Sequence, residues 1–280
     1  MGATTPDTIV LIHGLWMTPR SWDPWVERFS SRGYRVLAPA WPGIDREISD
    51  IRRDPSSLEG LGVTEIVDRY DRVIRELEQP PIIMGHSFGG LVTQLLVDRG
   101  LGAAAVPIAP APPKGILLLP WSSIRTAWPA LKNPANRKRS FTLSAKQFRY
   151  RFGNTLSEQE SNTVYERQYI PGTGRVLLQA AFANLSLNAA TKVDFRRPGR
   201  SPMLLISGEK DHVSPAALVR ANFKKYRRSP SITELREFPG RSHWLCGERG
   251  WEEIADFALT RALQMGAMDE SVHDQPWARA

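Results

Sequence analysis

Short apolar runs alternate with helical patterns along most of this 280-residue chain. The runs are rich in aliphatic and β-branched residues, which favour buried strands. Strands that are separated by helices pair in parallel, and helices then cover both faces of the sheet. The alternation therefore predicts an α/β fold with a mostly parallel sheet. The predicted strands are 8–12, 35–38, 82–84, 103–109, 201–207 and 233–238. One predicted helix of this core follows Ser21, and the others span 63–77, 91–98, 214–226 and 251–265. A loose polar end is expected at 266–280.

The pattern changes in the middle of the chain. From residue 112 to 197, prolines, aromatic residues and basic residues mix without a strand period, and 156–169 and 176–187 have helical composition. We predict an inserted helical cap here, with a core domain formed by 1–111 and 198–280. This segment holds 14 Lys/Arg and 4 Asp/Glu, whereas the whole chain has a net charge of +8. Such a surface suits anionic substrates, anionic lipid or nucleic acid, or it is simply a solvated exterior.

Composition and hydropathy indicate the cellular compartment and the structural class of the protein. The chain is 41% hydrophobic and 24% charged, as ordinary globular proteins are. No apolar run reaches the roughly 18 residues that span a bilayer, and residues 1–7 lack the features of a secretory signal. Cys246 is the one cysteine, and we expect a buried, inert thiol. A cytoplasmic protein without a transmembrane segment is the resulting expectation.

The sequence Gly85-His86-Ser87-Phe88-Gly89 fits G-x-S-x-G between a predicted strand and a predicted helix. In such a turn the serine backbone is strained, and glycines are needed because a side chain would collide with the sheet or the helix. The turn exposes the Ser87 hydroxyl and aims the Phe88 N–H at an oxyanion. Ser87 is therefore the predicted nucleophile.

A second loop follows the first predicted strand, with the sequence His13-Gly14-Leu15-Trp16. An oxyanion hole needs a second backbone N–H, and a glycine lets this loop approach the nucleophile. We assign that donor to Leu15, with Trp16 as the alternative. His13 is expected to order the loop.

A serine nucleophile needs a base, and the chain has five histidines. His86 adjoins Ser87 and should point elsewhere, whereas His273 lies in the predicted loose end. His243 follows the last predicted strand, where a loop can return over the carboxyl edge of the sheet. We predict His243 as the base, and His212 is the weaker candidate.

The base needs an acid that orients it and stabilises its charged form. Asp211 follows the penultimate predicted strand and can reach the same edge of the sheet. Glu209 and Asp194 are the alternatives. The resulting order of serine, aspartate and histidine is that of α/β-hydrolases and differs from the chymotrypsin and subtilisin orders.

With these motifs the chain resembles the α/β-hydrolase fold superfamily, in its esterase and lipase branch with a helical cap. The resemblance runs from about Thr8 to Met265 through H-G-L-W, G-H-S-F-G-G, S-G-E-K-D-H and G-R-S-H-W. It implies a parallel core, a cap before the strand that bears the acid, and no cofactor. The sequence shows no counterpart of the first antiparallel strands typical of the superfamily, which leaves the strand number open.

The resemblance also narrows the chemistry. Relatives that are haloalkane dehalogenases or epoxide hydrolases use an aspartate where this chain has Ser87, so acyl transfer to the serine is favoured. The sequence has no metal-ligand cluster, phosphate loop or dinucleotide fingerprint. We expect a serine hydrolase that cleaves a carboxylic ester of a small apolar or aromatic molecule. The predicted substrate pocket consists of Trp16, Trp121, Trp128, Phe152 and Trp244.

Other functions stay open at this point. The same three residues could serve a thioesterase, an acyltransferase, a perhydrolase or a carbon–carbon bond hydrolase. The chain could instead be a non-catalytic small-molecule receptor. Nucleic-acid or anionic-membrane binding through the basic segment is the third alternative, but no recognition motif supports it. The oligomeric state is not predicted.

Overall fold

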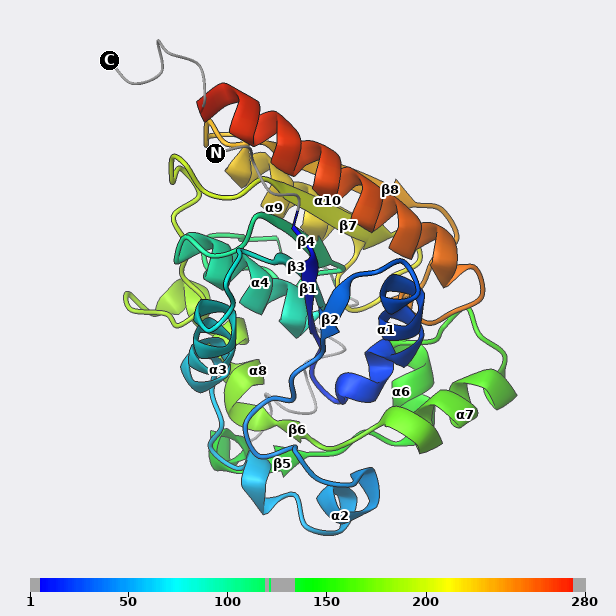
Figure 1. Ribbon diagram of the computed structural model, residues 1–280. Helices are drawn as coiled ribbons and strands as arrows, with labels where there is room; N and C mark the ends of the chain where they lie inside the picture. The colour runs from blue at the N-terminus through cyan, green and yellow to red at the C-terminus, as the bar shows by residue number, and fades with distance from the viewer. Residues whose placement is uncertain (1–5, 119–120, 122–133, 274–280) are drawn as a thin grey trace.

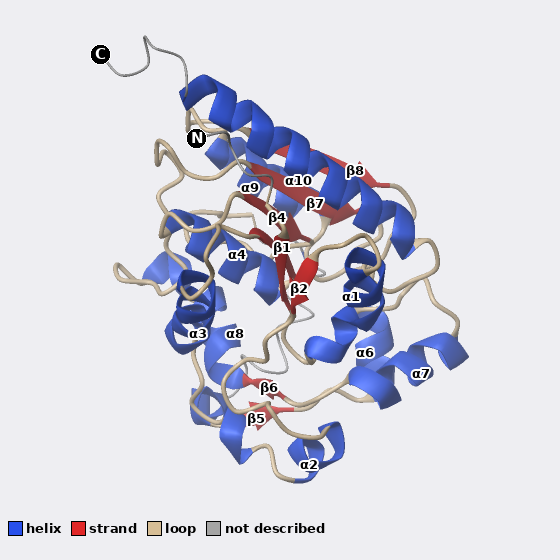
Figure 2. Ribbon diagram, viewed as in Figure 1, coloured by secondary structure: helices blue, strands red, loops and turns tan. Residues whose placement is uncertain are grey.

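The core of the protein is a six-stranded sheet in which every neighbouring pair of strands is parallel. This computed structural model describes residues 6–118, 121 and 134–273. The strand order is β2-β1-β3-β4-β7-β8, and Figure 2 shows the strands in red among the helices. The strands are β1 (Thr8–Ile12), β2 (Arg35–Leu37), β3 (Ile82–His86), β4 (Ala104–Ile108), β7 (Met203–Gly208) and β8 (Thr233–Phe238). The predicted α/β fold is confirmed.

The strand order reverses direction next to β1. From β1 the chain moves outward to the edge strand β2, and it then returns to β3 on the other side of β1. The loops after β1 and β3 therefore leave the sheet in opposite directions, which opens a crevice between the carboxyl ends of these strands. Ligands of open parallel sheets bind at such a point, and both predicted site loops begin there.

Side chains of the central strands alternate between two cores. Ile9 and Leu11 of β1 pack with α1 (Asp23–Ser30) and α10 (Trp251–His273) on one face of the sheet. Val10 and Ile12 pack on the other face with α3 (Val63–Arg75), α4 (Phe88–Asp98) and α9 (Ala216–Tyr226). All four β1 side chains are fully buried, as a strand covered on both faces requires. The two helical layers are seen in Figure 1.

The segment between β4 and β7, which we call the inserted segment, lies outside this sheet. It contains the two-stranded antiparallel sheet of β5 (Ser140–Phe141) and β6 (Gly172–Thr173). The helices in its described part are α6 (Ala145–Arg151), α7 (Glu158–Gln168) and α8 (Gly174–Ala181), with 3₁₀ turns η3 (Pro134–Lys138) and η4 (Ala183–Leu185). Figure 1 shows it at the end of the molecule to which the carboxyl ends of the strands point.

Local sequence explains where two of these helices begin. At the start of α6, the Ser144 hydroxyl accepts from the Gln147 N–H, and the Gln147 side chain accepts from the Ser144 N–H. Ser157 and Glu160 form the same reciprocal pair at the start of α7. Each pair satisfies two backbone donors that a helix start leaves free.

Some expected elements differ from those observed. The helix expected directly after Ser21 begins at Asp23, because Ser21 itself lies in the 3₁₀ turn η1 (Pro19–Trp22), where its hydroxyl donates to the Thr18 carbonyl. The predicted loose end was wrong for its first half, since α10 continues through Gly266 to His273. Helix α8 ends at Ala181, and the 3₁₀ turn η4 follows in place of the further helix expected to residue 187. Short elements were missed: α2 (Ile48–Arg53), η2 (Ser56–Leu58), β5, β6 and α6.

No helix in the described ranges is both long enough and apolar enough to cross a bilayer.

The turn from β3 into α4 passes very close to β1. A Cβ placed on Gly89 would lie 2.1 Å from the Ile12 carbonyl oxygen, and one on Gly85 would lie 2.2 Å from the Gly89 carbonyl oxygen. Both contacts are to backbone atoms, which cannot rotate away. Gly266 in α10 is different, because its nearest neighbour would be the Ala103 carbonyl oxygen at 3.8 Å.

These two environments predict opposite effects for the same substitution. We expect Gly89→Ala to lower the free energy of unfolding by about 2–3 kcal/mol, because the core must shift to admit the methyl group. Gly266→Ala should raise it by roughly 0.5–1 kcal/mol, because alanine stabilises a helix interior relative to glycine. Urea denaturation of both variants measures the difference, and equal effects of one sign would contradict it.

Candidate active site

Ser87 occupies a strained turn at the end of β3. Its backbone has φ 58° and ψ −118°, a region that residues with side chains rarely adopt. Two backbone hydrogen bonds hold it there, because the Ser87 N–H donates to the Ile108 carbonyl at 2.9 Å and its carbonyl accepts from the Ala111 N–H at 3.0 Å. Helix α4 begins at the next residue, Phe88. This is the geometry that the G-x-S-x-G pattern predicts.

Ser87, His243 and Asp211 lie in one chain of hydrogen bonds. The Ser87 Oγ is 2.9 Å from His243 Nε2, and His243 Nδ1 is 2.7 Å from Asp211 Oδ2. Since a carboxylate only accepts, Nδ1 carries the ring proton of neutral His243 and Nε2 is left to accept from the Ser87 hydroxyl. The structure thus brings together the three residues that the sequence analysis selected from loops after β3, β7 and β8.

The three side chains are buried and satisfied by the protein. Ser87 is 4% exposed, Asp211 is 3% exposed and His243 is fully buried. The other oxygen of Asp211, Oδ1, accepts from the Val213 and Ser214 N–H groups at 2.7 and 2.8 Å. These two donors fix the orientation of the carboxylate.

The loop after β1 lies directly against Ser87. A Cβ on Gly14 would be 3.0 Å from the Ser87 Cβ and 3.1 Å from the His86 carbonyl oxygen, so glycine permits this approach. Trp16, two residues on, has φ 68°, which bends the loop through the left-handed region. Within the described residues, no hydrogen bond occupies the N–H of Leu15 or of Phe88. Both predicted oxyanion donors therefore stay available.

His86 points away from the Ser87 hydroxyl, as expected, and has a partner that the sequence did not indicate. Its Nε2 donates to the His243 carbonyl oxygen at 2.7 Å, and its ring lies 4.8 Å from the His243 ring. Burial, and then the charge of His243, holds the pKa of His86 well below 6.5. Neutral His86 thus ties the serine turn to the histidine loop.

His13 orders the loop after β1, as the sequence analysis expected. Its Nδ1 is 3.0 Å from the Gly14 carbonyl oxygen, and its Nε2 accepts from the Trp41 N–H at 3.3 Å. The ring also stacks on Trp41 at 4.9 Å. Burial lowers the pKa of His13 from 6.5 to about 4.

The remaining candidates face other partners. His212 Nδ1 donates to the Tyr150 carbonyl at 2.9 Å, which turns this ring toward the inserted segment. Glu209 accepts from the Gly240 N–H at 2.7 Å, and Asp194 accepts from the Arg196 N–H at 2.9 Å. Cys246 is buried, and burial raises the pKa of its thiol well above 9.0.

Three of the five predicted pocket residues gather beside His243. The Phe152 ring packs edge-on against the His243 ring at 5.1 Å and against Trp16 at 6.0 Å. Trp244 packs edge-on against His86 at 6.2 Å. Trp121 is 77% exposed, and Trp128 lies outside the described residues.

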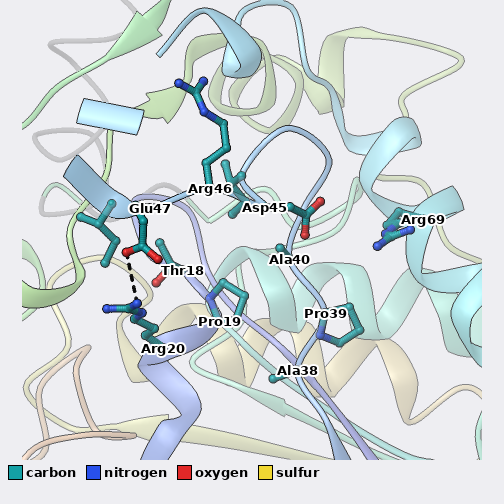
Figure 3. A pocket seen from close by; sticks show the side chains of 12 residues that line it. Thr18, Pro19, Arg20, Ala38, Pro39, Ala40, Asp45, Arg46, Glu47 and Arg69 are labelled. Carbon is teal, nitrogen blue, oxygen red and sulfur yellow. Dashed lines mark hydrogen bonds and ion pairs between the residues drawn. The ribbon is translucent and has the colours of Figure 1, made fainter. Parts of the chain in front are cut away.

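A cavity of about 660 Å³ opens elsewhere on the molecule. Figure 3 shows its lining, which comes from η1, the loop after β2 and Arg69 of α3, and includes the Arg20–Glu47 ion pair at 3.3 Å. None of Ser87, Asp211 and His243 lines it. The cavity is therefore distinct from the buried hydrogen-bonded chain.

In the described ranges, no three side chains of His, Cys, Asp or Glu come together in a way that could hold a metal ion.

Comparison with known families decides the identity of the fold. The family model described as "Alpha/beta hydrolase family" matches residues 9–257. The chain belongs to the alpha/beta hydrolase family. A search of curated proteins found no match.

Solved structures of other alpha/beta hydrolases are similar over nearly their whole length. A monoacylglycerol lipase from Paleococcus ferrophilus aligns with a TM-score of 0.67 and 22% identity, over 93% of this chain and 96% of that one. An extracellular alpha/beta-hydrolase from a Paenibacillus species gives 0.64 and 19%, over 92% and 99%. A pyrethroid hydrolase from Sphingobium faniae JZ-2 gives 0.60 and 22%, over 91% and 98%. At these identities the similarity shows the fold alone.

Burial lowers the pKa of two histidines of this alpha/beta hydrolase, His13 and His86, and this predicts acid sensitivity. A histidine whose pKa is lower in the folded chain binds fewer protons than in the unfolded chain, so stability falls as pH falls from about 6.5 toward 4. For His13 the full loss is about 3 kcal/mol, and above pH 6.5 its contribution is constant. Urea denaturation at pH 7.5, 5.5 and 4.5 should show this fall.

The matched variant is His13→Asn, which keeps a donor near the Nδ1 position and has no group that titrates in this range. We expect its free energy of unfolding to depend less steeply on pH over the same interval. Parallel pH profiles for the wild type and the variant would contradict the assignment.

Proposed function

We propose that this protein is a serine hydrolase that cleaves a carboxylic ester of a small apolar or aromatic molecule. The observation that carries the proposal is the buried chain from Ser87 through His243 to Asp211, with distances of 2.9 and 2.7 Å. A serine hydroxyl is a weak nucleophile until a neighbouring base takes its proton. His243 is placed to do so, and Asp211 holds its ring in the required tautomer.

The reaction then proceeds in two halves. Ser87 Oγ attacks the ester carbonyl while its proton passes to His243 Nε2, and the carbonyl oxygen becomes an oxyanion. His243 returns the proton to the leaving alcohol, which departs and leaves an acyl group on Ser87. Water enters, gives a proton to His243 and attacks the acyl group. The carboxylic acid leaves as Ser87 regains its proton.

The oxyanion is assigned to the N–H groups of Leu15 and Phe88. The contact between Gly14 and Ser87 sets the first loop against the nucleophile, and Phe88 is the first residue of α4, so its N–H has no partner inside the helix. Two such donors in a buried site stabilise developing charge strongly, because water does not compete for them.

The substrate class follows from the rings around His243. Trp16 and Phe152 contact one another, and Phe152 contacts the base, so apolar surface adjoins the reacting atoms. Such walls favour an acyl chain or an aromatic group. We assign the inserted segment as the cap that supplies this surface. The names of two similar structures, a monoacylglycerol lipase and a pyrethroid hydrolase, agree with a small ester substrate.

The proposal predicts a single reactive serine. A fluorophosphonate probe should label Ser87, as mapped by mass spectrometry, and Ser87→Ala should lose labelling and at least about 10³-fold of its ester hydrolysis while staying folded. Asp211→Asn and His243→Ala should label far more slowly, because the hydroxyl is then not activated. The control is Ser31→Ala, which changes an exposed serine at the C-terminal end of α1 and should match the wild type in labelling and in hydrolysis.

Two results would decide against the proposal. Full ester hydrolysis by Ser87→Ala would show that another group reacts. A folded wild type that neither labels nor hydrolyses any of a panel of esters, thioesters and peracid-forming substrates, yet binds a small molecule tightly, would favour a receptor. Within the panel, a preference for thioesters or for acyl transfer would keep the nucleophile and change the substrate.

A further inference from the structure

A short part of the inserted segment contacts both of the loops that carry His243 and Asp211. We call residues 150–155, at the end of α6, the brace. Toward the loop of Asp211, the Asn154 side-chain N–H donates to the Lys210 carbonyl at 2.9 Å. His212 donates to the Tyr150 carbonyl at 2.9 Å. These bonds hold the residues on either side of Asp211.

The brace also reaches the loop of His243. The Trp244 N–H donates to the Phe152 carbonyl at 2.9 Å, so the residue after the base is fixed by the brace backbone. The Phe152 side chain packs edge-on against the His243 ring. The base is therefore supported through its ring and through its neighbouring peptide.

Glu248 completes this support from the other side of His243. Its side chain is buried, with 7% of the residue exposed, and its Oε2 accepts from the hydroxyl of Thr155 in the brace at 2.7 Å. The same carboxylate accepts from the Ser242 hydroxyl at 2.8 Å and from the Ser242 N–H at 3.1 Å. One carboxylate thus joins the brace to the residue before the base.

We infer that Thr155 and Glu248 are positioning residues for His243, so that the inserted segment supports catalysis as well as shaping the pocket. This inference rests on the proposed function of Ser87, His243 and Asp211. A buried carboxylate that loses a donor must find another or shift. Here the shift would move Ser242, and with it the adjacent base.

Such a movement affects the rate more than the binding of substrate. Proton transfer from Ser87 to His243 depends on a donor–acceptor distance of 2.9 Å in the resting enzyme. Displacement of a catalytic group by a fraction of an ångström lowers the rate for every substrate, whatever its size. A residue that only lines the pocket would instead change KM, and chiefly for the larger substrates.

The test is a pair of substitutions at one position. Thr155→Val removes the hydroxyl and keeps the shape of the side chain, whereas Thr155→Ser keeps the hydroxyl. With p-nitrophenyl acetate and p-nitrophenyl octanoate, we expect Thr155→Val to lose about tenfold in kcat for both esters, with KM changed less than twofold. Thr155→Ser should restore kcat to within about twofold of the wild type.

Glu248→Gln provides a second measurement at the other end of the bond. Its amide keeps the volume but accepts fewer hydrogen bonds and carries no charge, so we expect a loss in kcat similar to that of Thr155→Val. Thermal unfolding of each variant shows whether it is folded at the assay temperature. If Thr155→Val does not fold, the comparison of Thr155→Ala with Thr155→Ser decides the same question.

The outcomes separate this inference from the proposed function. A wild type that labels at Ser87, with Thr155→Val equal to it in kcat or changed only in KM for the octanoate, would overturn the inference and leave the function intact. An equal loss of kcat in Thr155→Val and Thr155→Ser would also overturn it. A wild type that never labels at Ser87 would overturn both.

Discussion

The position of Ser87 depends on a backbone contact that only glycine permits. Because Gly89 lies against the Ile12 carbonyl, the first turn of α4 can pack against the end of β1, beside the loop that starts with His13. The same approach places Gly14 against Ser87. One packing constraint therefore sets the positions of the proposed nucleophile and of both candidate oxyanion donors, which follow strands that are neighbours at the point where the strand order reverses. The strain at Ser87 is stored by that packing.

Burial imposes the second constraint on the site. Ser87, His243 and Asp211 are almost inaccessible to water, so each polar atom needs a partner from the protein. Two backbone N–H groups satisfy the outer oxygen of Asp211, and the histidine satisfies the inner one. In such surroundings a polar group that loses its hydrogen-bond partner costs free energy, because water cannot replace that partner. The fixed conformation of the loops after β7 and β8 therefore keeps Asp211 and His243 hydrogen-bonded to one another.

Sequence patterns predicted those features that have a local signal. Apolar runs located the strands, and the glycines around Ser87 indicated a tight turn because their spacing has a steric cause. Ser87, Asp211 and His243 each follow a predicted strand, which placed all three at one edge of a parallel sheet, where the structure finds them hydrogen-bonded. The family match over residues 9–257 agrees with that fold.

The features that were missed depend on contacts between distant parts of the chain. The hydrogen bond from His86 to the His243 carbonyl spans 157 residues, and no spacing or composition announces it. Helix α10 packs Ala262 and Met265 into the core beside β4, and it continues past Gly266 to His273 despite the weak helix propensity of glycine. The short strands β5 and β6 have two residues each, too few for a period to appear.

Under the proposed function, the supports of His243 also connect specificity with rate. The sheet holds its carbonyl through His86, and the inserted segment holds its neighbours through Phe152 and Thr155. The inserted segment is in turn fixed to the core, because Arg52 of α2 donates to the Tyr169 carbonyl at 2.9 Å. Substitutions in residues 150–155 that reshape the pocket therefore act on the base as well. Changes to the Phe152 ring remove a packing contact with His243 but leave the backbone acceptor of the Trp244 N–H in place. Changes to Thr155 instead remove a hydrogen bond to Glu248, so the two positions act on His243 through different contacts.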